Sequence, residues 1–187
     1  MKKALMLFSL ITLFAVDVFA QDDVEILKKD DATGDFYYEE VVTADGLKQD
    51  ELFKRAKAWI LANLKTGDNN ITFDDKNYST VNTGAMKVKT LKSMSLVIHD
   101  GYFDFKFHVW CKDGRYKLRL DNVMFYVVVS QTMQGTTSRT YSYTELKDKK
   151  LDQHLKKDAN SKLSSLATIF KQDMAKSAAE VKQNNDW

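Results

Sequence analysis

The sequence predicts one α+β domain of two layers, in which two helices cover one face of a mainly antiparallel sheet. Three observations predict this class. A tight hairpin shows strict alternation of apolar and polar residues, two stretches carry apolar residues at helical spacing, and short aromatic or β-branched stretches lie between them. The order along the chain is strand, helix, four strands and helix (β-α-β4-α). A sheet with one apolar face needs a cover, and the two helices supply it.

The composition is that of an ordinary globular domain. The chain has 187 residues, of which 44% are hydrophobic and 29% are charged. It contains no proline, which excludes Pro-rich linkers and polyproline ligands. The formal net charge of +2 is close to zero and indicates no particular partner. The single cysteine, Cys111, excludes an internal disulfide.

Residues 1–20 have the pattern of a secretory signal peptide. A basic start precedes the apolar run from Ala4 to Val16, and Val18 and Ala20 stand at positions −3 and −1 of the predicted cleavage site. The run is shorter than the roughly 20 residues that a membrane span needs, which disfavours a retained anchor. We therefore expect a secreted chain, periplasmic or extracellular, that begins at Gln21 and has no membrane span after cleavage.

Three further segments follow the predicted signal peptide. We expect an N-terminal lead-in over residues 21–32, a single domain over residues 33–182 and a frayed tail over residues 183–187. The glycines are evenly spaced, and Gly84 is predicted to mark a strand bulge. The other six are predicted to mark boundaries between elements: Gly34, Gly46, Gly67, Gly101, Gly114 and Gly135.

The first predicted strand covers residues 36–43, which are aromatic and β-branched and lie between turn residues. From Gln49 onwards, apolar residues recur every three or four positions, which predicts an amphipathic helix that ends near Gly67. A turn is predicted at residues 68–70.

Two short strands are predicted next, over residues 71–75 and 79–89. Residues 90–101 are ambiguous. Within them, Met94 to Ile98 fit either an extra strand or the end of a long connection.

The clearest pattern runs from Tyr102 to Val129 and predicts a hairpin with a two-residue type I′ turn at Asp113 and Gly114. On the buried face the predicted register pairs Cys111 with Tyr116, Val109 with Leu118 and Phe107 with Leu120. On the other face it pairs Trp110 with Lys117, His108 with Arg119 and Lys106 with Asp121. Residues 123–129 are apolar throughout, so we expect this part of the strand to be covered on both sides.

The last third of the chain combines a polar stretch and a long helix. Residues 130–149 are rich in Thr and Ser and predict a loop or an irregular hairpin. An apolar stripe from Leu151 to Val181 then predicts a helix that lies across the sheet. Asn160 and Ser161 are weak helix formers, which leaves open whether this helix is continuous.

Three segments resemble a known family: Tyr38 to Val42, Asp50 to Phe53 with the following Trp59, and Lys112 to Tyr116. They are similar to a family of secreted bacterial domains of unknown function with a TATA-binding-protein-like (TBP-like) fold. The resemblance covers residues 33–129 and the closing helix, and the β-α-β4-α order that it implies agrees with the elements above. Such domains often have a Ser or Thr helix cap where this chain has Lys48. The resemblance implies no activity, ligand or catalytic residue.

One surface combines basic groups with an aromatic ring, namely the hairpin face that points away from the helices. Its residues are Lys106, His108, Trp110, Lys117 and Arg119. In the resembled fold this face is open and concave and is used for DNA, but a secreted protein does not meet promoter DNA, so we expect no nucleic acid partner. We hypothesise that the face binds an envelope protein or an anionic or sugar-like ligand, with Trp110 as a stacking platform. The plain alternative is that Trp110 packs on the Lys117 stem as an ordinary cross-strand pair.

The sequence shows no catalytic or metal-binding motif. The histidines and Cys111 have no metal-ligand spacing, and Cys111 falls on the buried face, where a small hydrophobe is expected rather than a nucleophile; an intermolecular disulfide is the alternative. We expect no cofactor, no metal and no enzymatic activity. The predicted function is a secreted binding or structural module of unknown ligand. The alternative is a cell-envelope hydrolase with dispersed catalytic residues, and homodimer formation is left open.

Overall fold

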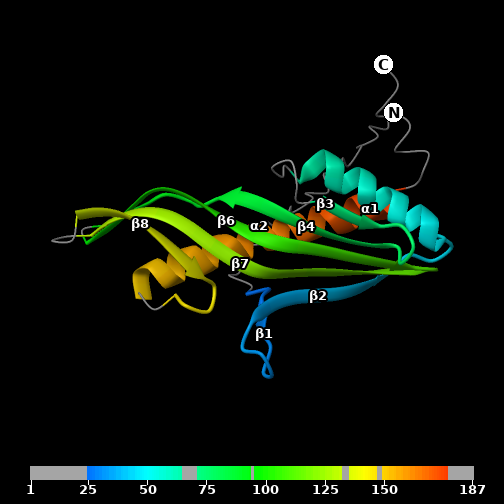
Figure 1. Ribbon diagram of the computed structural model, residues 1–187, viewed down its shortest axis with the longest axis horizontal. Coiled ribbons are helices and arrows are strands. Elements are labelled where there is room, and N and C mark those ends of the chain that lie inside the picture. The colour runs from blue at the N-terminus through cyan, green and yellow to red at the C-terminus, as the bar shows by residue number, and fades with distance from the viewer. Residues whose placement is uncertain (1–24, 65–70, 94, 132–134, 147–148, 177–187) are drawn as a thin grey trace, which may run out of the picture.

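The structure is a computed structural model (Figure 1). It describes residues 25–64, 71–93, 95–131, 135–146 and 149–176. The predicted signal peptide, the predicted turn at residues 68–70 with Gly67 before it, and the predicted tail lie outside the described residues. The predicted division into lead-in and domain stays a prediction.

Two helices and eight strands make up the described part of the chain. In order, they are β1 (Lys28–Lys29), β2 (Phe36–Thr43), α1 (Gln49–Asn63), β3 (Ile71–Asp74), β4 (Ser79–Lys87), β5 (Leu91–Lys92), β6 (Leu96–Lys112), β7 (Arg115–Gln131), β8 (Gly135–Ser142) and α2 (Lys149–Ala175).

All described strands belong to one antiparallel sheet. Six of them have the order β1-β2-β7-β6-β4-β3, while β5 pairs with β6 and β8 pairs with β7 outside this order. The long β6–β7 hairpin forms its centre and crosses the molecule, with α2 running behind it in this view (Figure 1). β2 pairs with the first half of β7, and β8 pairs with the second half. The two halves of β7 therefore have different neighbours along the same edge.

Both helices pack on the same face of the sheet. The ring of Trp59 on α1 stacks on Phe107 of β6, with 5.5 Å between ring centres. The ring of Phe170 on α2 meets Phe107 edge-on at 5.2 Å and Trp59 at 4.9 Å. These three aromatic residues join the two helices and the sheet at one point in the core. The predicted fold class, α+β with two helices on one face of an antiparallel sheet, is confirmed. The predicted β-α-β4-α order is too short for the described residues, because β1 precedes β2 and the additional strands β5 and β8 lie between the helices.

The central hairpin has the predicted register near its turn. Cys111 pairs with Tyr116, and the other predicted pairs on both faces are formed as well. The prediction of a type I′ turn is wrong, because that turn needs a positive φ at both central residues. Gly114 has a φ of +72°, whereas Asp113 has no positive φ.

The turn of this hairpin is held by the segment that precedes α1. The amide of Gly114 donates a hydrogen bond to the carbonyl of Leu47 (2.9 Å). The Asp113 carboxylate accepts one from the amide of Gln49 (2.8 Å), the first residue of α1. Lys48, at the N-cap position, makes no side-chain cap. Asp113 therefore caps α1 from a distant part of the chain in place of a local Ser or Thr.

Gly84 does not mark a bulge, contrary to the prediction. β4 pairs with β6 without a register shift from Ser79 to Lys87. A Cβ atom at Gly84 would lie only 2.3 Å from the ring of Phe105. The glycine is needed because the buried phenylalanine ring of the neighbouring strand occupies the space of a side chain.

Residues 90–101 contain strands rather than a long connection. β5 pairs with Val97 and Ile98 at the start of β6. Gly101 thus lies inside β6, where it was predicted to mark a boundary. A Cβ atom there would lie 2.7 Å from the carbonyl oxygen of Tyr126 and from the side chain of Val127. Four other predicted boundaries are confirmed, because these glycines lie between elements or at the start of one: Gly34, Gly46, Gly114 and Gly135.

The second half of the β6–β7 hairpin is irregular and only partly covered. The register shifts between Asp104 and Lys106, and Asn122 on the opposite strand has a φ of +51°. Beyond this bulge, the residues of β7 that face the helices are buried, while those on the other face are half-buried. Tyr126 on that face stacks on Tyr102, which is 46% exposed. The prediction that residues 123–129 are covered on both sides is therefore wrong for the second face.

The polar stretch after β7 contains β8, which pairs antiparallel with the second half of β7. Of the two predicted alternatives, a loop or an irregular hairpin, the hairpin is correct, but its pairing has no register shift. The closing helix α2 is continuous through Asn160, so the weak helix formers do not break it. The last residues of the predicted apolar stripe, Ala178 and Val181, lie outside the described residues. None of the described helices is both long enough and apolar enough to cross a membrane.

Candidate binding face

The predicted site residues lie on the sheet face that points away from the helices. Strand alternation puts His108 of β6 and Arg119 of β7 opposite each other on this face. β2 and β4 extend the row on either side, with Glu39 beside Arg119 and Val81 beside His108. We call this surface the open face.

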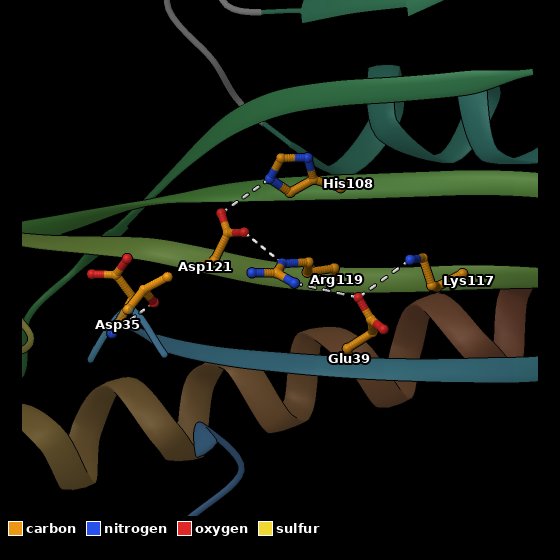
Figure 2. A network of polar contacts seen from close by, with 7 residues as sticks. Asp35, Glu39, His108, Lys117, Arg119 and Asp121 are labelled. Carbon is orange, nitrogen blue, oxygen red and sulfur yellow. Dashed lines mark hydrogen bonds and ion pairs between the residues drawn. The ribbon is translucent and has the colours of Figure 1, made fainter. Parts of the chain in front are cut away.

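A chain of polar contacts connects three strands of the open face (Figure 2). The Asp121 carboxylate binds His108 Nε2 at 3.0 Å through Oδ1 and accepts a hydrogen bond from Arg119 Nε at 2.7 Å through Oδ2. The Glu39 carboxylate contacts Arg119 Nη1 at 3.5 Å and Lys117 Nζ at 3.3 Å. The two carboxylates therefore bridge the three basic side chains.

Trp110 contacts two of the other predicted residues. The Lys117 ammonium lies over the indole ring, 4.5 Å from its centre. The imidazole of His108 stacks nearly parallel to the indole, with 5.4 Å between ring centres and 6° between ring planes. Lys106 is not part of this network, because its ammonium donates to the hydroxyl of Thr83 at 2.7 Å. The structure thus brings four of the five predicted residues together and places the fifth beside them.

Pairing fixes the charges of this network. Burial alone would raise the pKa of Asp121, but hydrogen bonds from His108 and Arg119 outweigh it and lower that pKa below its ordinary value. The hydrogen bond to Asp121 raises the pKa of Arg119 against the effect of burial, and Glu39 adds to it. Both carboxylates are thus matched by Arg119 and Lys117, which leaves this network close to neutral.

Sequence reasoning did not assign Glu39 and Asp121 to the site. Asp121 was predicted only as the partner across from Lys106, and nothing local places Glu39 beside β7. Tyr37 was also missed, and its ring lies 4.5 Å from the Arg119 guanidinium carbon. The pairing of β2 with β7 brings Glu39 and Tyr37 into the site. Side chains alternate along a strand, so the predicted strand at residues 36–43 puts these two side chains on one face. It does not show which strand lies alongside.

A hollow of about 270 Å³ adjoins the network at the edge of β7, between β2 and β8. The bulge at Asn122 lies in its wall. Asp35, at the start of β2, lies close to the Asp121 end of the network (Figure 2). The lining residues are Asp35, Phe36, Arg119, Asp121, Asn122, Val123, Ser142, Tyr143 and Thr144.

Cys111 is buried, as its place in the alternating strand predicts, and burial raises the pKa of its thiol to about 12. A thiol with this pKa is protonated at neutral pH and is a poor nucleophile. Within the described residues, no group of three or more His, Cys, Asp or Glu side chains is arranged to hold a metal ion.

Comparison with known proteins now identifies the family. Residues 38–126, from β2 to the second half of β7, match the model of DUF4468, a domain of unknown function with a TBP-like fold. The chain contains a DUF4468 domain. This confirms the family and the fold that the sequence resembles.

Two solved structures have a fold similar to that of this DUF4468 domain. A DUF4468 family protein from Bacteroides ovatus matches with a TM-score of 0.61 and 12% identity, over 82% of this chain and 93% of that one. A TBP-like protein from Parabacteroides distasonis matches with a TM-score of 0.59 and 13% identity, over 76% of this chain and 94% of that one. At such low identity these likenesses concern the fold alone. The comparison with curated proteins gave no match.

Proposed function

We propose that this DUF4468 domain is a secreted, non-enzymatic binding module that docks an envelope protein on the open face of its sheet. One observation carries the proposal: Trp110 and Arg119 are held in fixed positions within a nearly neutral network on the sheet face opposite the helices. The predicted signal peptide supports a location in the cell envelope or outside the cell.

The composition of the open face is that of a protein interface. Trp, Tyr and Arg are the residue types that contribute most to protein–protein binding, and Trp110, Tyr37 and Arg119 lie on neighbouring strands. Val41 and Val81, which flank them, are 57% and 38% exposed and offer apolar contact area. Because Arg119 is already fixed by Asp121, Glu39 and the Tyr37 ring, it loses little side-chain entropy when a partner binds.

The other ligands considered for this face fit less well. An anionic polymer would have to compete with Glu39 and Asp121 for Lys117 and Arg119. A sugar ring would have to compete with His108 and Lys117 for the Trp110 indole. A protein partner can instead contact the outer edges of the Trp110 and Arg119 side chains, together with the exposed Val41 and Val81. Such contacts leave the network intact.

A hydrolase is the alternative in a different class. It would draw on the hydrogen bond between His108 and Asp121, which resembles the pairing of a general base with its orienting carboxylate. Arg119 shares the same carboxylate, and the lowered pKa of Asp121 keeps it ionised at neutral pH. Asp121 can thus orient His108 but cannot act as a general acid.

The experiment is quantitative affinity capture from the envelope fraction of the cells that make the protein. The double variant Trp110→Ala with Arg119→Ala removes both anchors, and we expect it to lose the proteins that the wild type captures. The matched control is Leu61→Ala with Lys54→Ala, which removes an apolar side chain that is 63% exposed and a cation from the surface of α1. This control should capture as the wild type does.

Two results would contradict this proposed function. One is equal capture by the wild type and the open-face double variant. The other is a captured ligand that survives protease treatment and is released by glycosidase, which would show that the ligand is a sugar polymer.

A further inference from the structure

The second half of the open face, beside β8, carries an aromatic pair next to a carboxylate. Tyr102 of β6 and Tyr126 of β7 lie opposite each other, and their rings stack with 4.8 Å between ring centres. Tyr102 is 46% exposed. Asp104 lies on the same strand as Tyr102, with the fully buried Phe103 between them. Because side chains alternate along a strand, Asp104 and the two rings are neighbours on the open face.

The half-buried Asp104 carboxylate forms no hydrogen bond or ion pair with any residue in the described part of the chain. Burial raises the pKa of Asp104 and outweighs the charge of Lys106, which lowers it. The Lys106 ammonium donates instead to the Thr83 hydroxyl at 2.7 Å. Lys87, opposite Tyr102 on β4, makes no ion pair with Asp104 either. A cation that reached this carboxylate would meet a charge that no ion pair has neutralised.

The same protein shows repeatedly what accompanies an aromatic ring and a carboxylate that lie together. Every cation that lies over an aromatic ring among the described residues also forms an ion pair with a carboxylate. These ion pairs are Lys57 with Asp75, Lys117 with Glu39, Arg119 with Asp121, and Lys156 with Asp152. The ring attracts the cation and the carboxylate balances its charge. Tyr102, Tyr126 and Asp104 provide the rings and the carboxylate of this arrangement and lack a cation of their own.

The other half of the open face indicates which cation fits. Tyr37 and Asp121 are direct partners across β2 and β7. The Arg119 guanidinium carbon lies 4.5 Å from the centre of the Tyr37 ring, and Arg119 Nε donates to Asp121 at 2.7 Å. One guanidinium thus contacts a ring and a carboxylate at neighbouring positions of this sheet. A guanidinium is flat, stacks on an aromatic ring and donates two hydrogen bonds to one carboxylate, which the ammonium of lysine does not do.

We propose that Tyr102, Tyr126 and Asp104 form a subsite of the open face that receives the guanidinium group of an arginine side chain on the docked protein. The guanidinium stacks on the exposed Tyr102 ring and donates hydrogen bonds to the Asp104 carboxylate. This inference rests on the proposed function and deepens it, because it names the chemistry that the partner presents to the second half of the open face.

The first test is an NMR titration of the purified protein with the probe acetyl-arginine methylamide. The matched probe is acetyl-citrulline methylamide, which has the same shape and no charge. We expect the arginine probe to bind with a dissociation constant of roughly 10 mM, typical of one partly exposed cation site, and to shift the resonances of Tyr102 and Asp104. The citrulline probe should bind about threefold more weakly or less tightly still.

Two positions test the two parts of the subsite. Asp104→Asn keeps the size of the side chain and removes its charge, and we expect it to weaken binding of the arginine probe about threefold. The matched control is Asp31→Asn, which removes an exposed carboxylate in the turn between β1 and β2 and should bind the probe as the wild type does. Tyr102→Ala removes the ring and should also weaken binding. Tyr102→Phe keeps the ring and should bind the probe more tightly than Tyr102→Ala.

The second test repeats the affinity capture from the envelope fraction with Asp104→Lys. This change puts a positive charge where the arginine of the partner would lie, and we expect at least about tenfold less captured protein, because like charges in contact disfavour a complex strongly. The matched control is Asp31→Lys, which makes the same change of charge in the turn between β1 and β2 and should capture as the wild type does.

The results that would overturn the subsite differ from those that would overturn the proposed function. No binding of the arginine probe, equal affinity of the two probes, or equal affinity of the arginine probe for wild type and Asp104→Asn would overturn the subsite, whatever the capture experiment gives. Undiminished capture by Asp104→Lys, together with loss of capture by the Trp110→Ala, Arg119→Ala double variant, would also overturn it and leave the proposed function standing. Equal capture by that double variant and the wild type would contradict the proposed function alone.

Discussion

Asn160 and Tyr116 are both buried polar residues on the helix-covered side of the sheet, yet one is fully paired and the other is not. Asn160, in the middle of α2, is 6% exposed and Tyr116, on β7 near the end of α2, is 2% exposed. The Asn160 side chain makes four hydrogen bonds, whereas the Tyr116 hydroxyl makes none with the described residues. Equal burial therefore has opposite consequences in the two regions.

The hydrogen-bond partners of Asn160 show how a fully paired, buried amide joins separate segments of the chain. Its oxygen accepts hydrogen bonds from the amides of Ile26 and Leu27 at 2.9 Å and 3.1 Å. Its nitrogen donates to the hydroxyl of Tyr143 at 2.7 Å. Asn160 thus fastens the segment before β1 and the segment after β8 to α2. The Asn160 side chain therefore links distant segments of the fold, while the Tyr116 hydroxyl adds no hydrogen bond to it within the described residues.

The largest expected effect is that of Asn160→Ala. The change leaves the amides of Ile26 and Leu27 without their acceptor and removes the hydrogen bond to the Tyr143 hydroxyl, which keeps its bond to Glu25. We therefore expect the free energy of unfolding to fall by about 3 kcal/mol. Urea denaturation measures this. The matched control is Asn63→Ala on α1, because the Asn63 amide lies at an exposed position and, among the described residues, donates to the carbonyl of Trp59 alone. A loss from Asn160→Ala no greater than that from Asn63→Ala would contradict the account.

A smaller effect is expected on the open face, where polar groups are paired but partly exposed. The pKa of Asp121 is below its ordinary value, because hydrogen bonds from His108 and Arg119 outweigh burial. The ionised carboxylate thus stabilises the folded state above its ordinary pKa of about 4, and this contribution is lost as the pH falls through the lowered pKa. We expect Asp121→Asn to lower the free energy of unfolding by about 1 to 2 kcal/mol at neutral pH.

The pH dependence provides the check for Asp121. The difference in unfolding free energy between wild type and Asp121→Asn should shrink as the pH is lowered below about 4. Asp75→Asn is the control, since the side chain of Asp75 is 72% exposed in its ion pair with Lys57 and such pairs contribute little. A difference for Asp121→Asn that stays constant down to acid pH would show that the carboxylate charge is not what stabilises the network.

The parts of the fold that depend on local pattern were predictable. The strand at residues 36–43 has the predicted bounds, because its aromatic and β-branched residues lie between turn residues. The hairpin around Gly114 has the predicted pairing, because the alternation of apolar and polar residues fixes its register. The pattern also put Tyr116 on the buried face. Its unpaired hydroxyl was not predictable, since that depends on where α2 ends above β7.

The parts that depend on distant neighbours were missed. From the sequence, Gly84 is predicted to mark a bulge and Gly101 a boundary between elements. In the structure, each makes room for a side chain of an adjacent strand. The hairpin alone brings four residues of the candidate site together, while Glu39 comes from a strand that pairs with β7, 80 positions away from Arg119 in the chain. Sequence pattern shows which face a side chain takes, but not which strand becomes its neighbour.

The most direct test of the account compares the same substitution at the paired and the unpaired tyrosine. Tyr143→Phe removes a hydroxyl that Asn160 donates to, and we expect a loss of about 1 kcal/mol in unfolding free energy. Tyr116→Phe removes a hydroxyl without a partner, and we expect no loss or a small gain. Urea denaturation of both variants beside the wild type measures the difference. A loss from Tyr116→Phe as large as that from Tyr143→Phe would contradict the claim that the Tyr116 hydroxyl plays no part in holding the fold.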